Sequence, residues 1–502
     1  MPLGERFCQN VWRVNMVMSK CSAATWLALA VVLAAGWAGV APAEEPRFDP
    51  EGEWRAHVIE VSADAHEAGE YTLQDAFNDL PETGGTVALG EGEFVVARVS
   101  APEGRPIVMK GKGPDTVVKA ESNQTSITFH PTPHLEVTGM AFSGHRRALV
   151  LADGAYGHIK IHNAQFSDIS LNAIQGVMPG PVQRLTVTEC RFENVNLAVN
   201  FRVNDARNME VSNNAFYNIG TRPIIVGARS GDQRYARIMN NHIEGVGPGR
   251  HPIGILSYVD YTVIAGNTLM DIHGEARHEG ISSRGGNTVI WDNKMVNAGG
   301  HTAAISLAGS GPTLILKNVI RFTDEHKGHS WNGMDLRQRQ VQVVGNEITG
   351  TTRGVVSRRG IQGMLIKDNF IGDSPRQIKG IRICISTGAV IPKESMGGLT
   401  IRNNTFSNIA KEEGDGGFQG VLFNIVNHRG EHDTRMDDVV IAGNVFKDID
   451  VADGSAGVHF TELYRETSHM RNVRIVGNDF GDIDVPVTEA KQHVEELHIA
   501  DE

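Results

Sequence analysis

The feature that most constrains the fold is a short phrase that recurs between residues 137 and 480. Each copy has Ile or Val three positions before a common column and an apolar residue two positions after it. The copies are spaced 23 to 28 residues apart at first, and then 35, 40 and 34 residues apart. The column contains Met140, Ala164, Cys190, Asn214, Asn241, Asn267, Asn293, Asn318, Asn346, Asn369, Asn404, Asn444 and Asn478.

A period near 25 residues that carries strands but no helical pattern predicts an all-β solenoid of about 13 coils in one domain. Each coil buries its inward side chains only by stacking on its neighbours. Asn suits the turn column because it tolerates a left-handed backbone. Its amide can also hydrogen-bond to the same residue one coil away, which predicts a ladder of asparagines. The spacings above 30 residues predict loops inserted into the last coils.

The segment before the repeat predicts a cap. Within residues 71–80, Leu73, Ala76, Phe77 and Leu80 share one helical face. A short helix at this place would protect the open end of a solenoid from edge pairing. We therefore divide the chain into an N-terminal segment and cap (44–120), the repeats (121–486) and a C-terminal tail or second cap (487–502).

The first 43 residues are typical of a secretory signal. Residues 21–43 carry no charge and contain an apolar run at 26–33. Ala41-Pro42-Ala43 supplies the small residues of a cleavage site. The sequence thus predicts a secreted or periplasmic protein with no stable membrane span after cleavage.

Charge and cysteine content narrow the classes of partner. The whole chain has a net charge of −12, and without residues 1–43 the balance becomes 44 − 58 = −14. Such acidity argues against a general nucleic-acid binder, which needs clustered Lys and Arg. Cys190 and Cys384 remain after cleavage, far apart in sequence, and are expected to be buried thiols. The sequence leaves the oligomeric state open.

A second strand precedes the Asn column by about 10 to 13 residues, often after a Gly. Alternation places its third and fifth residues outward. Arg337 and Arg358 then occupy one outward column on adjacent coils, with Asp335 and Arg382 in the neighbouring column. The outward positions of earlier coils are Leu256 with Tyr258, and Ser282 with Arg284.

The arginines form the candidate site. Like charges at neighbouring strand positions repel, and a ligand carboxylate or sulfate would relieve the repulsion through bidentate contacts. On a chain of this acidity the arginines predict an acidic polysaccharide as partner. Two simpler readings stay open: the arginines are ordinary solvated residues, or Asp335 pairs with one of them.

The cap region resembles a known superfamily. The helix and strand block through Gly92-Glu93-Phe94, together with residues 110–116, resembles the N-terminal cap of the pectate-lyase-like superfamily. The resemblance implies a right-handed parallel β-helix over most of the mature chain. It leaves the activity open, because this superfamily contains lyases, hydrolases, epimerases and non-catalytic proteins.

Three or four coils resemble the alginate lyase and chondroitinase B family. The matching stretches are residues 354–360, followed by 368–372 and 380–383. The family places a catalytic Lys base one coil before a catalytic Arg, which implies catalytic roles for Arg337 and Arg358. Carboxylates shortly before that Lys bind Ca²⁺ in the family. Residues 326–331 contain none, and the nearest are Asp324 and Glu325, so we expect no cofactor, and Ca²⁺ stays open as the alternative.

The resemblance implies β-elimination at a uronic acid, with Arg358, Arg382 and Arg284 neutralising the substrate carboxylate. Arg337 stands where the family has its base, but a guanidinium is a poor base. Tyr258, His329 and His301 are the alternatives, and Asp335 and Tyr258 are expected to contact substrate. A non-catalytic glycan-binding or cell-surface protein, or a hydrolase or epimerase, stays open. Hydrolysis needs paired outward carboxylates, whereas Asp335 stands alone.

Overall fold

The computed structural model describes residues 52–122, 124–275, 277–299, 302–323, 332–358, 361–374, 379–386, 396–410, 417–426, 434–450, 454–461, 468–481, 483–488 and 494–500. The predicted signal, residues 1–43, lies outside these ranges and stays a prediction. Phe48–Glu502 form one compact unit, and this unit is described below.

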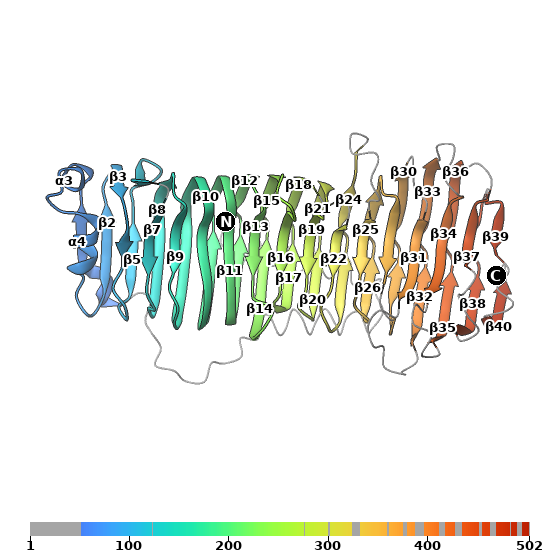
Figure 1. Cartoon of the computed structure of the whole chain (residues 1–502). Helices are drawn as coiled ribbons and strands as arrows, with labels where there is room; N and C mark the ends of the chain where they lie inside the picture. The colour runs from blue at the N-terminus through green and yellow to red at the C-terminus, as the bar shows by residue number, and fades with distance from the viewer. Residues whose placement is uncertain are drawn as a thin grey trace. The chain divides into compact units, whose positions relative to one another are not determined.

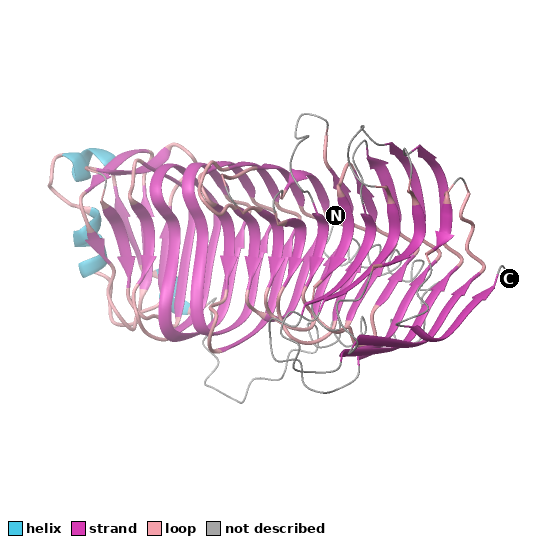
Figure 2. Ribbon diagram, turned by 45° about the vertical axis from the view of Figure 1, so that its right-hand side comes forward, coloured by secondary structure: helices cyan, strands magenta, loops and turns pink. Residues whose placement is uncertain are grey.

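The unit is nearly all β, a parallel solenoid of about 14 turns with almost no helix, as Figures 1 and 2 show. This confirms the predicted all-β solenoid. Strands pair in parallel with those one coil before and one coil after them, and strands at the two ends of the solenoid pair on one side. The strands form three faces: face 1 precedes the Asn column in each coil, face 2 follows it, and face 3 completes the coil.

Face 1 contains the strands that lead into the Asn column: β1 (Val58–Val61), β2 (Gly85–Leu89), β5 (Ile107–Lys110), parts of β8 (His134–Ser143), β10 (Tyr156–Thr188) and β11 (Arg191–Ser212), then β14 (Asp232–Met239), β17 (Asp260–Ala265), β20 (Thr288–Trp291), β23 (Thr313–Leu316), β26 (Val341–Val344), β29 (Leu365–Lys367), β32 (Met396–Arg402), β35 (Thr434–Ala442), β38 (Ser468–Val476) and β40 (Val494–Ala500). Face 2 contains the strands that follow the column: β3 (Gly92–Val96), β6 (Thr116–Ala120), parts of β8, β10 and β11, then β12 (Ala215–Ile219), β15 (His242–Val246), β18 (Thr268–Ile272), β21 (Lys294–Ala298), β24 (Val319–Arg321), β27 (Glu347–Thr349), β30 (Phe370–Ser374), β33 (Thr405–Ala410) and β36 (Val445–Asp450).

Face 3 completes each coil with β4 (Val99–Ser100), β7 (Thr125–Phe129), β9 (Arg147–Leu151), parts of β10 and β11, then β13 (Arg222–Val226), β16 (Ile253–Ser257), β19 (Glu279–Ser283), β22 (Ala303–Leu307), β25 (Asn332–Leu336), β28 (Arg353–Ser357), β31 (Lys379–Ser386), β34 (Gln419–Val426), β37 (Ala456–Phe460) and β39 (Val485–Val487). This face carries the candidate site.

The asparagine ladder is present. The Nδ2 of Asn214 donates to the Oδ1 of Asn241 at 3.0 Å, and the same bond recurs at every step down to Asn444 and Asn478 at 2.9 Å. The left-handed backbone lies one residue earlier than predicted. Asn213, with φ of 57°, and the corresponding residues of other coils adopt it. The column therefore needs the amide, and the position before it needs the left-handed conformation.

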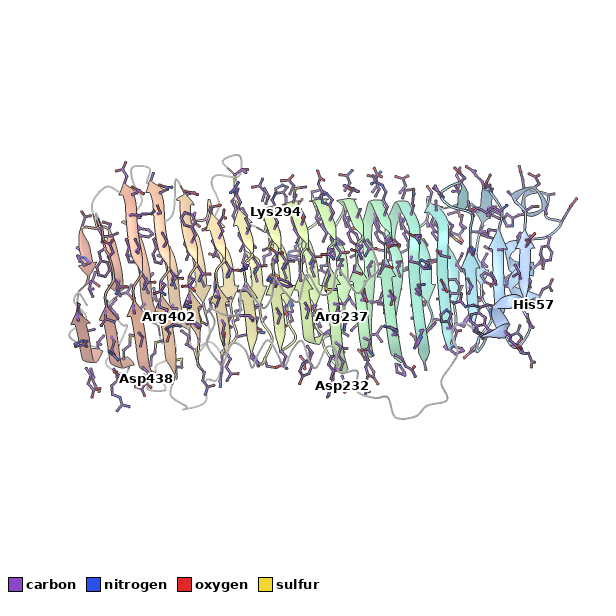
Figure 3. All side chains as sticks on the ribbon, turned by 180° about the vertical axis from the view of Figure 1, so that it is seen from behind. His57, Asp232, Arg237, Lys294, Arg402 and Asp438 are labelled. Atoms are coloured by element: carbon purple, nitrogen blue, oxygen red, sulfur yellow. The ribbon has the colours of Figure 1, made fainter. Side chains whose placement is uncertain are left out.

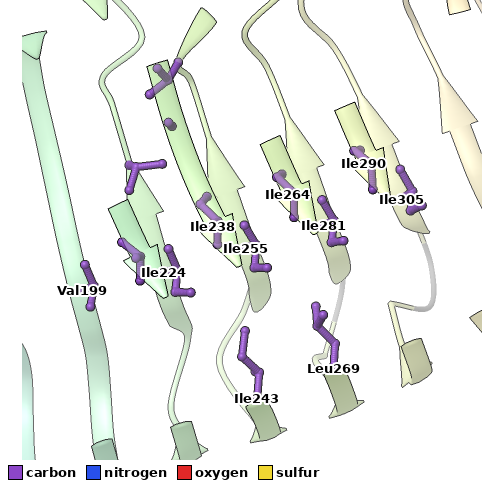
Figure 4. Close-up of a cluster of buried hydrophobic side chains, with 14 of the residues drawn as sticks. Val199, Ile224, Ile238, Ile243, Ile255, Ile264, Leu269, Ile281, Ile290 and Ile305 are labelled. Carbon is purple, nitrogen blue, oxygen red and sulfur yellow. The ribbon is translucent and has the colours of Figure 1, made fainter. Parts of the chain in front are cut away.

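The core is built from inward residues that stack coil on coil. Figure 4 shows buried Ile side chains of faces 1, 2 and 3 meeting inside the coils. Two positions after the Asn column, Phe142, Phe166, Phe192 and Phe216 stack with ring centroids 4.8 to 5.0 Å apart. Charged side chains such as Lys294 and Asp438 project outward and are exposed (Figure 3).

The predicted capping helix is present as α4 (Leu73–Asn78). Thr72 and Asp75 form a capping box at its start, and the helix buries Leu73, Ala76 and Phe77. A 3₁₀ turn, η1 (Glu53–Ala56), and a short helix, α3 (Ala63–Glu67), precede it. At the other end, β40 pairs with β38, so solenoid strands continue into the segment predicted as a tail or cap.

Cys190 is buried and makes no disulfide, as predicted for a buried thiol. Burial raises the pKa of its thiol to about 12, so it is inert toward oxidation at neutral pH. The side chain of Cys384 lies outside the described residues. In the part of the chain that the structure describes, no helix has both the length and the apolar character needed to cross a membrane.

Replacing one ladder asparagine tests the structural role of the column. In Asn318→Ala the amide no longer donates to Ile290 O and Asn346 Oδ1, and it no longer accepts from Asn293. Because these partners stay buried, we expect the free energy of unfolding to fall by about 3 kcal/mol. Urea denaturation measures the fall. Gln165→Ala, on an exposed position, is the control, and equal stability of the two variants would contradict a structural ladder.

Candidate functional site

The register of face 3 places the predicted residues in two outward columns. Arg337 N donates to Leu307 O and Arg358 N to Leu336 O, both at 3.0 Å, so the two arginines follow equivalent positions on adjacent coils. Asp335 pairs with Val356, and Val356 with Arg382. Tyr258, Arg284 and Ala308 precede Arg337 in its column on successive coils, since their backbone N–H groups continue the same bonding pattern. The predicted arrangement of these residues is confirmed.

Asp335 holds both arginines of the predicted pair. Its Oδ2 accepts from the Nη2 of Arg337 at 2.8 Å and from its Nε at 3.2 Å, and its Oδ1 lies 3.2 Å from the Nε of Arg358. The Asp335 side chain is fully buried, whereas those of Arg337 and Arg358 are 36% and 43% exposed. The carboxylate thus offsets much of the repulsion that the sequence predicts between the arginines.

Two further arginines complete what we name the arginine cluster: Arg337 and Arg358, which pair with Asp335, and Arg353 and Arg382, which lie in β28 and β31. The Nε atoms of Arg353 and Arg382 are buried and have no hydrogen-bond partner among the described residues. Burial, followed by the charges of Arg382 and Arg358, lowers the pKa of Arg353. The positive charge of the cluster therefore exceeds what Asp335 neutralises.

Arg353 escaped the sequence reasoning because the strands of face 3 are irregular where they begin. A Cβ added to Gly354 would lie 2.6 Å from the side chain of Ile371 in the core, and the next residue, Val355, is also in the core. Gly354 and Val355 thus both face inward, and the residue before them, Arg353, faces outward. The signal in the sequence is a charged residue directly before the strand-opening glycine, as in Arg353-Gly354 and Glu279-Gly280.

A second group of cations lies earlier on face 3, and we name it the upstream cluster: Arg202, Arg222, Arg229 and Arg284 around Tyr258. The Tyr258 hydroxyl oxygen lies 3.5 Å from both Arg284 Nη1 and Arg229 Nε. The guanidinium of Arg284 also lies 5.5 Å from the centre of the Tyr258 ring. Burial, and then the charge of Arg202, lowers the pKa of Arg222.

An apolar patch lies within the upstream cluster. Ile225, Ile253 and Leu256 face outward from the core and are themselves buried against one another, with Tyr258 packed beside them. The partly exposed phenol ring, which packs on these buried side chains, is suited to the carbon-bound hydrogens of a sugar, next to cations suited to its acidic group.

The structure argues against Arg337 as a base. Its hydrogen bond to Asp335 raises its pKa above the already high value of an arginine, so the guanidinium keeps its proton. Of the alternative bases, Tyr258 lies within the upstream cluster. His301 and His329 lie outside the described residues, as do Asp324 and Glu325, the carboxylates nearest to the position implied for Ca²⁺.

The described residues do not fit a metal ion. Within them no group of three His, Cys, Asp or Glu side chains is placed to hold one. Asp335, the carboxylate of the arginine cluster, already binds two guanidiniums.

Comparisons with known proteins give structural neighbours only, since no protein-family model and no curated protein matches the chain. The catalytic unit of a GH87 α-1,3-glucanase from Streptomyces thermodiastaticus is 11% identical, with 84% of this chain and 70% of that chain covered and a TM-score of 0.39. The N-terminal fragment of gene product 12 of bacteriophage Phi29 is 12% identical, with 87% and 93% covered and a TM-score of 0.47. A surface adhesin of Streptococcus pneumoniae is 12% identical, with 79% and 92% covered and a TM-score of 0.37. Similarity at this level does not assign a function to the chain.

Removing the charge of Asp335 tests its role in holding the arginine cluster together. In Asp335→Asn the guanidiniums of Arg337 and Arg358 lose their shared carboxylate. We expect the free energy of unfolding to fall by about 2 kcal/mol, less than for a fully buried ion pair because both arginines are partly exposed. Chemical denaturation measures the fall. Asp438→Asn, an exposed residue of face 1, is the matched control, and a loss no larger than that of the control would refute this role.

Proposed function

We propose that the protein is exported, binds an acidic polysaccharide along face 3 and cleaves it by β-elimination. The observation that carries the proposal is the arginine cluster, in which two guanidiniums pair with one buried carboxylate and two more arginines nearby add their charge. On a chain with a net charge of −12, this excess positive charge creates a local site for anions.

Arg337 and Arg358 are partly exposed. Asp335 engages Arg337 through Nε and Nη2, which uses two of its three nitrogens. The Nε groups of Arg353 and Arg382 are buried, so these two arginines add charge beside the ligand. A sugar carboxylate bound by Arg337 and Arg358 would gain charge-assisted hydrogen bonds, and its charge would offset the repulsion that, after burial, lowers the pKa of Arg353.

β-Elimination needs a cation at the substrate carboxylate and a base at the neighbouring carbon. The base takes the proton from the carbon next to the carboxylate, the electron pair of that C–H bond forms the C=C bond, and the glycosidic C–O bond breaks. The leaving oxygen takes up a proton from water or from the base that has just been protonated. We assign the base to Tyr258 and the neutralising cation to Arg284, because the phenol oxygen and the guanidinium lie 3.5 Å apart. The mechanism uses no metal ion, and Arg337 has no part in proton removal.

A non-catalytic glycan-binding protein is the second candidate. The excess charge of the arginine cluster supports binding whether or not a base lies beside the bound sugar. Hydrolysis is less suited to this face because Asp335, the carboxylate of its arginine cluster, is held by two guanidiniums and is fully buried.

The binding part of the proposal is tested with Arg353→Ala combined with Arg382→Ala. We expect affinity for alginate, pectate or glycosaminoglycan oligosaccharides to fall by about 100-fold, since two of the four positive charges of the arginine cluster are lost. Isothermal titration calorimetry measures the affinity. Arg474→Ala, on an exposed position of face 1, should bind as the wild type does. No binding of any acidic oligosaccharide by the wild type would end the proposal.

The catalytic part is tested with Tyr258→Phe, which keeps the ring and removes the hydroxyl. We expect the release of unsaturated uronate, followed by its ultraviolet absorbance, to fall by about 100-fold or more while binding stays within a few-fold of the wild type. Undiminished turnover in this variant would exclude Tyr258 as the base. A wild type that binds but never releases an unsaturated product would favour the non-catalytic candidate.

A further inference from the structure

The spacing of charges along face 3 bears on which acidic polysaccharide fits. The outward column that runs through Tyr258, Arg284, Ala308, Arg337 and Arg358 has one residue on each successive coil. Arg284 and Arg337 are two coils apart, or about 10 Å along the solenoid at the usual spacing of neighbouring strands. The residue between them, Ala308, is exposed and uncharged.

On face 3, the described residues of the coil between the two cations carry no positive charge. Besides Ala308, its outward residues in β22 are Ala303 and Ser306, which are small and buried. A sugar residue above this strand meets no cation from these residues. An acidic group placed there would lose its hydration without gaining an ionic partner.

Glu279 adds a negative charge beside this neutral coil. It opens β19, two residues before the register pair Ile281 and Ile305, and so lies next to Ala303. The strand register places it in the row that runs from Arg222 through Ile253 and Ala303 to Arg353, and so between the two clusters. Its Oε2 is buried and has no hydrogen-bond partner among the described residues. A carboxylate at this place repels a sugar carboxylate, whereas an uncharged sugar meets no such repulsion.

We propose that the ligand is an acidic heteropolysaccharide in which an uncharged sugar separates successive anionic sugars. This inference rests on the proposed function. One anionic sugar lies at Arg284, the next lies at Arg337 and Arg358, and the uncharged sugar between them lies over Ala308 beside Glu279. The chain runs along the solenoid, because the column follows successive coils. A polymer made only of uronic acids would place an additional anionic sugar beside Glu279.

The test compares two acidic oligosaccharides of equal length. A hyaluronan octasaccharide alternates uronic acid with an uncharged amino sugar, whereas an octagalacturonate carries an acid on every sugar. Isothermal titration calorimetry with the full chain should give about tenfold tighter binding of the hyaluronan octasaccharide, the difference expected for one ill-placed charge. If the wild type cleaves either probe, both titrations use the Tyr258→Phe protein.

Ala308→Lys provides the decisive variant, because it places a cation on the neutral coil at an exposed position. We expect it to improve octagalacturonate affinity by about tenfold and so to remove the preference. Ala308→Gln, which adds length without charge, should keep the preference of the wild type. The thermal unfolding midpoints of both variants confirm that they fold.

The outcomes separate this inference from the function on which it rests. Octagalacturonate binding equal to or tighter than hyaluronan binding in the wild type would overturn the inference and leave an acidic polysaccharide as ligand. The same holds if Ala308→Lys and Ala308→Gln bind octagalacturonate equally well. Failure of the wild type to bind either probe, or any other acidic oligosaccharide, would overturn the proposed function itself.

Discussion

The hydrogen bond between equivalent asparagine amides on adjacent coils is the interaction on which the rest of the structure depends. Each amide donates to the next asparagine and to a carbonyl of the preceding coil, as Asn318 does with Asn346 and Ile290. These bonds fix where one coil sits on another. Because the register holds even where the coils are spaced by 35 and 40 residues, long insertions do not disturb the faces.

A fixed register turns separate positions of the sequence into straight outward columns. Arg337 and Arg358 become neighbours for this reason alone, although 21 residues separate them. Stacking by itself would make such a pair unfavourable. The buried carboxylate of Asp335 reduces the repulsion between Arg337 and Arg358, since it pairs with both guanidiniums. Arg353 and Arg382 add positive charge that this one carboxylate does not neutralise. The solenoid thus gathers excess positive charge at one place on an acidic chain.

Much of the fold and of the outward columns could be predicted from the sequence, because the spacing of a repeat shows which residues occupy equivalent positions on successive coils. The Asn column, the stacked Phe residues and the capping helix at Leu73–Asn78 all come from spacing. Arg353 and Glu279 do not, since the two inward residues that begin each strand break the simple alternation. The pairing of Asp335 with two arginines instead of one is also beyond spacing, because it depends on the side-chain conformations of all three residues. The left-handed conformation belongs to the residue before the asparagine. Several residue types occupy that position, so the sequence pattern does not reveal it.

The two clusters differ in what they can do to a bound sugar. Tyr258 lies one coil from Arg284 and three coils from Arg337, or about 5 Å and about 14 Å along the solenoid. A base must lie within hydrogen-bond reach of the proton that it removes. Under the proposed function, Tyr258 would therefore act on a sugar held by Arg284 and not on one held by the arginine cluster. The proposal thus assigns chain binding to the arginine cluster and bond breaking to the upstream cluster. It gives a binding role to Arg337 and Arg358, the positions for which the family resemblance implies catalysis.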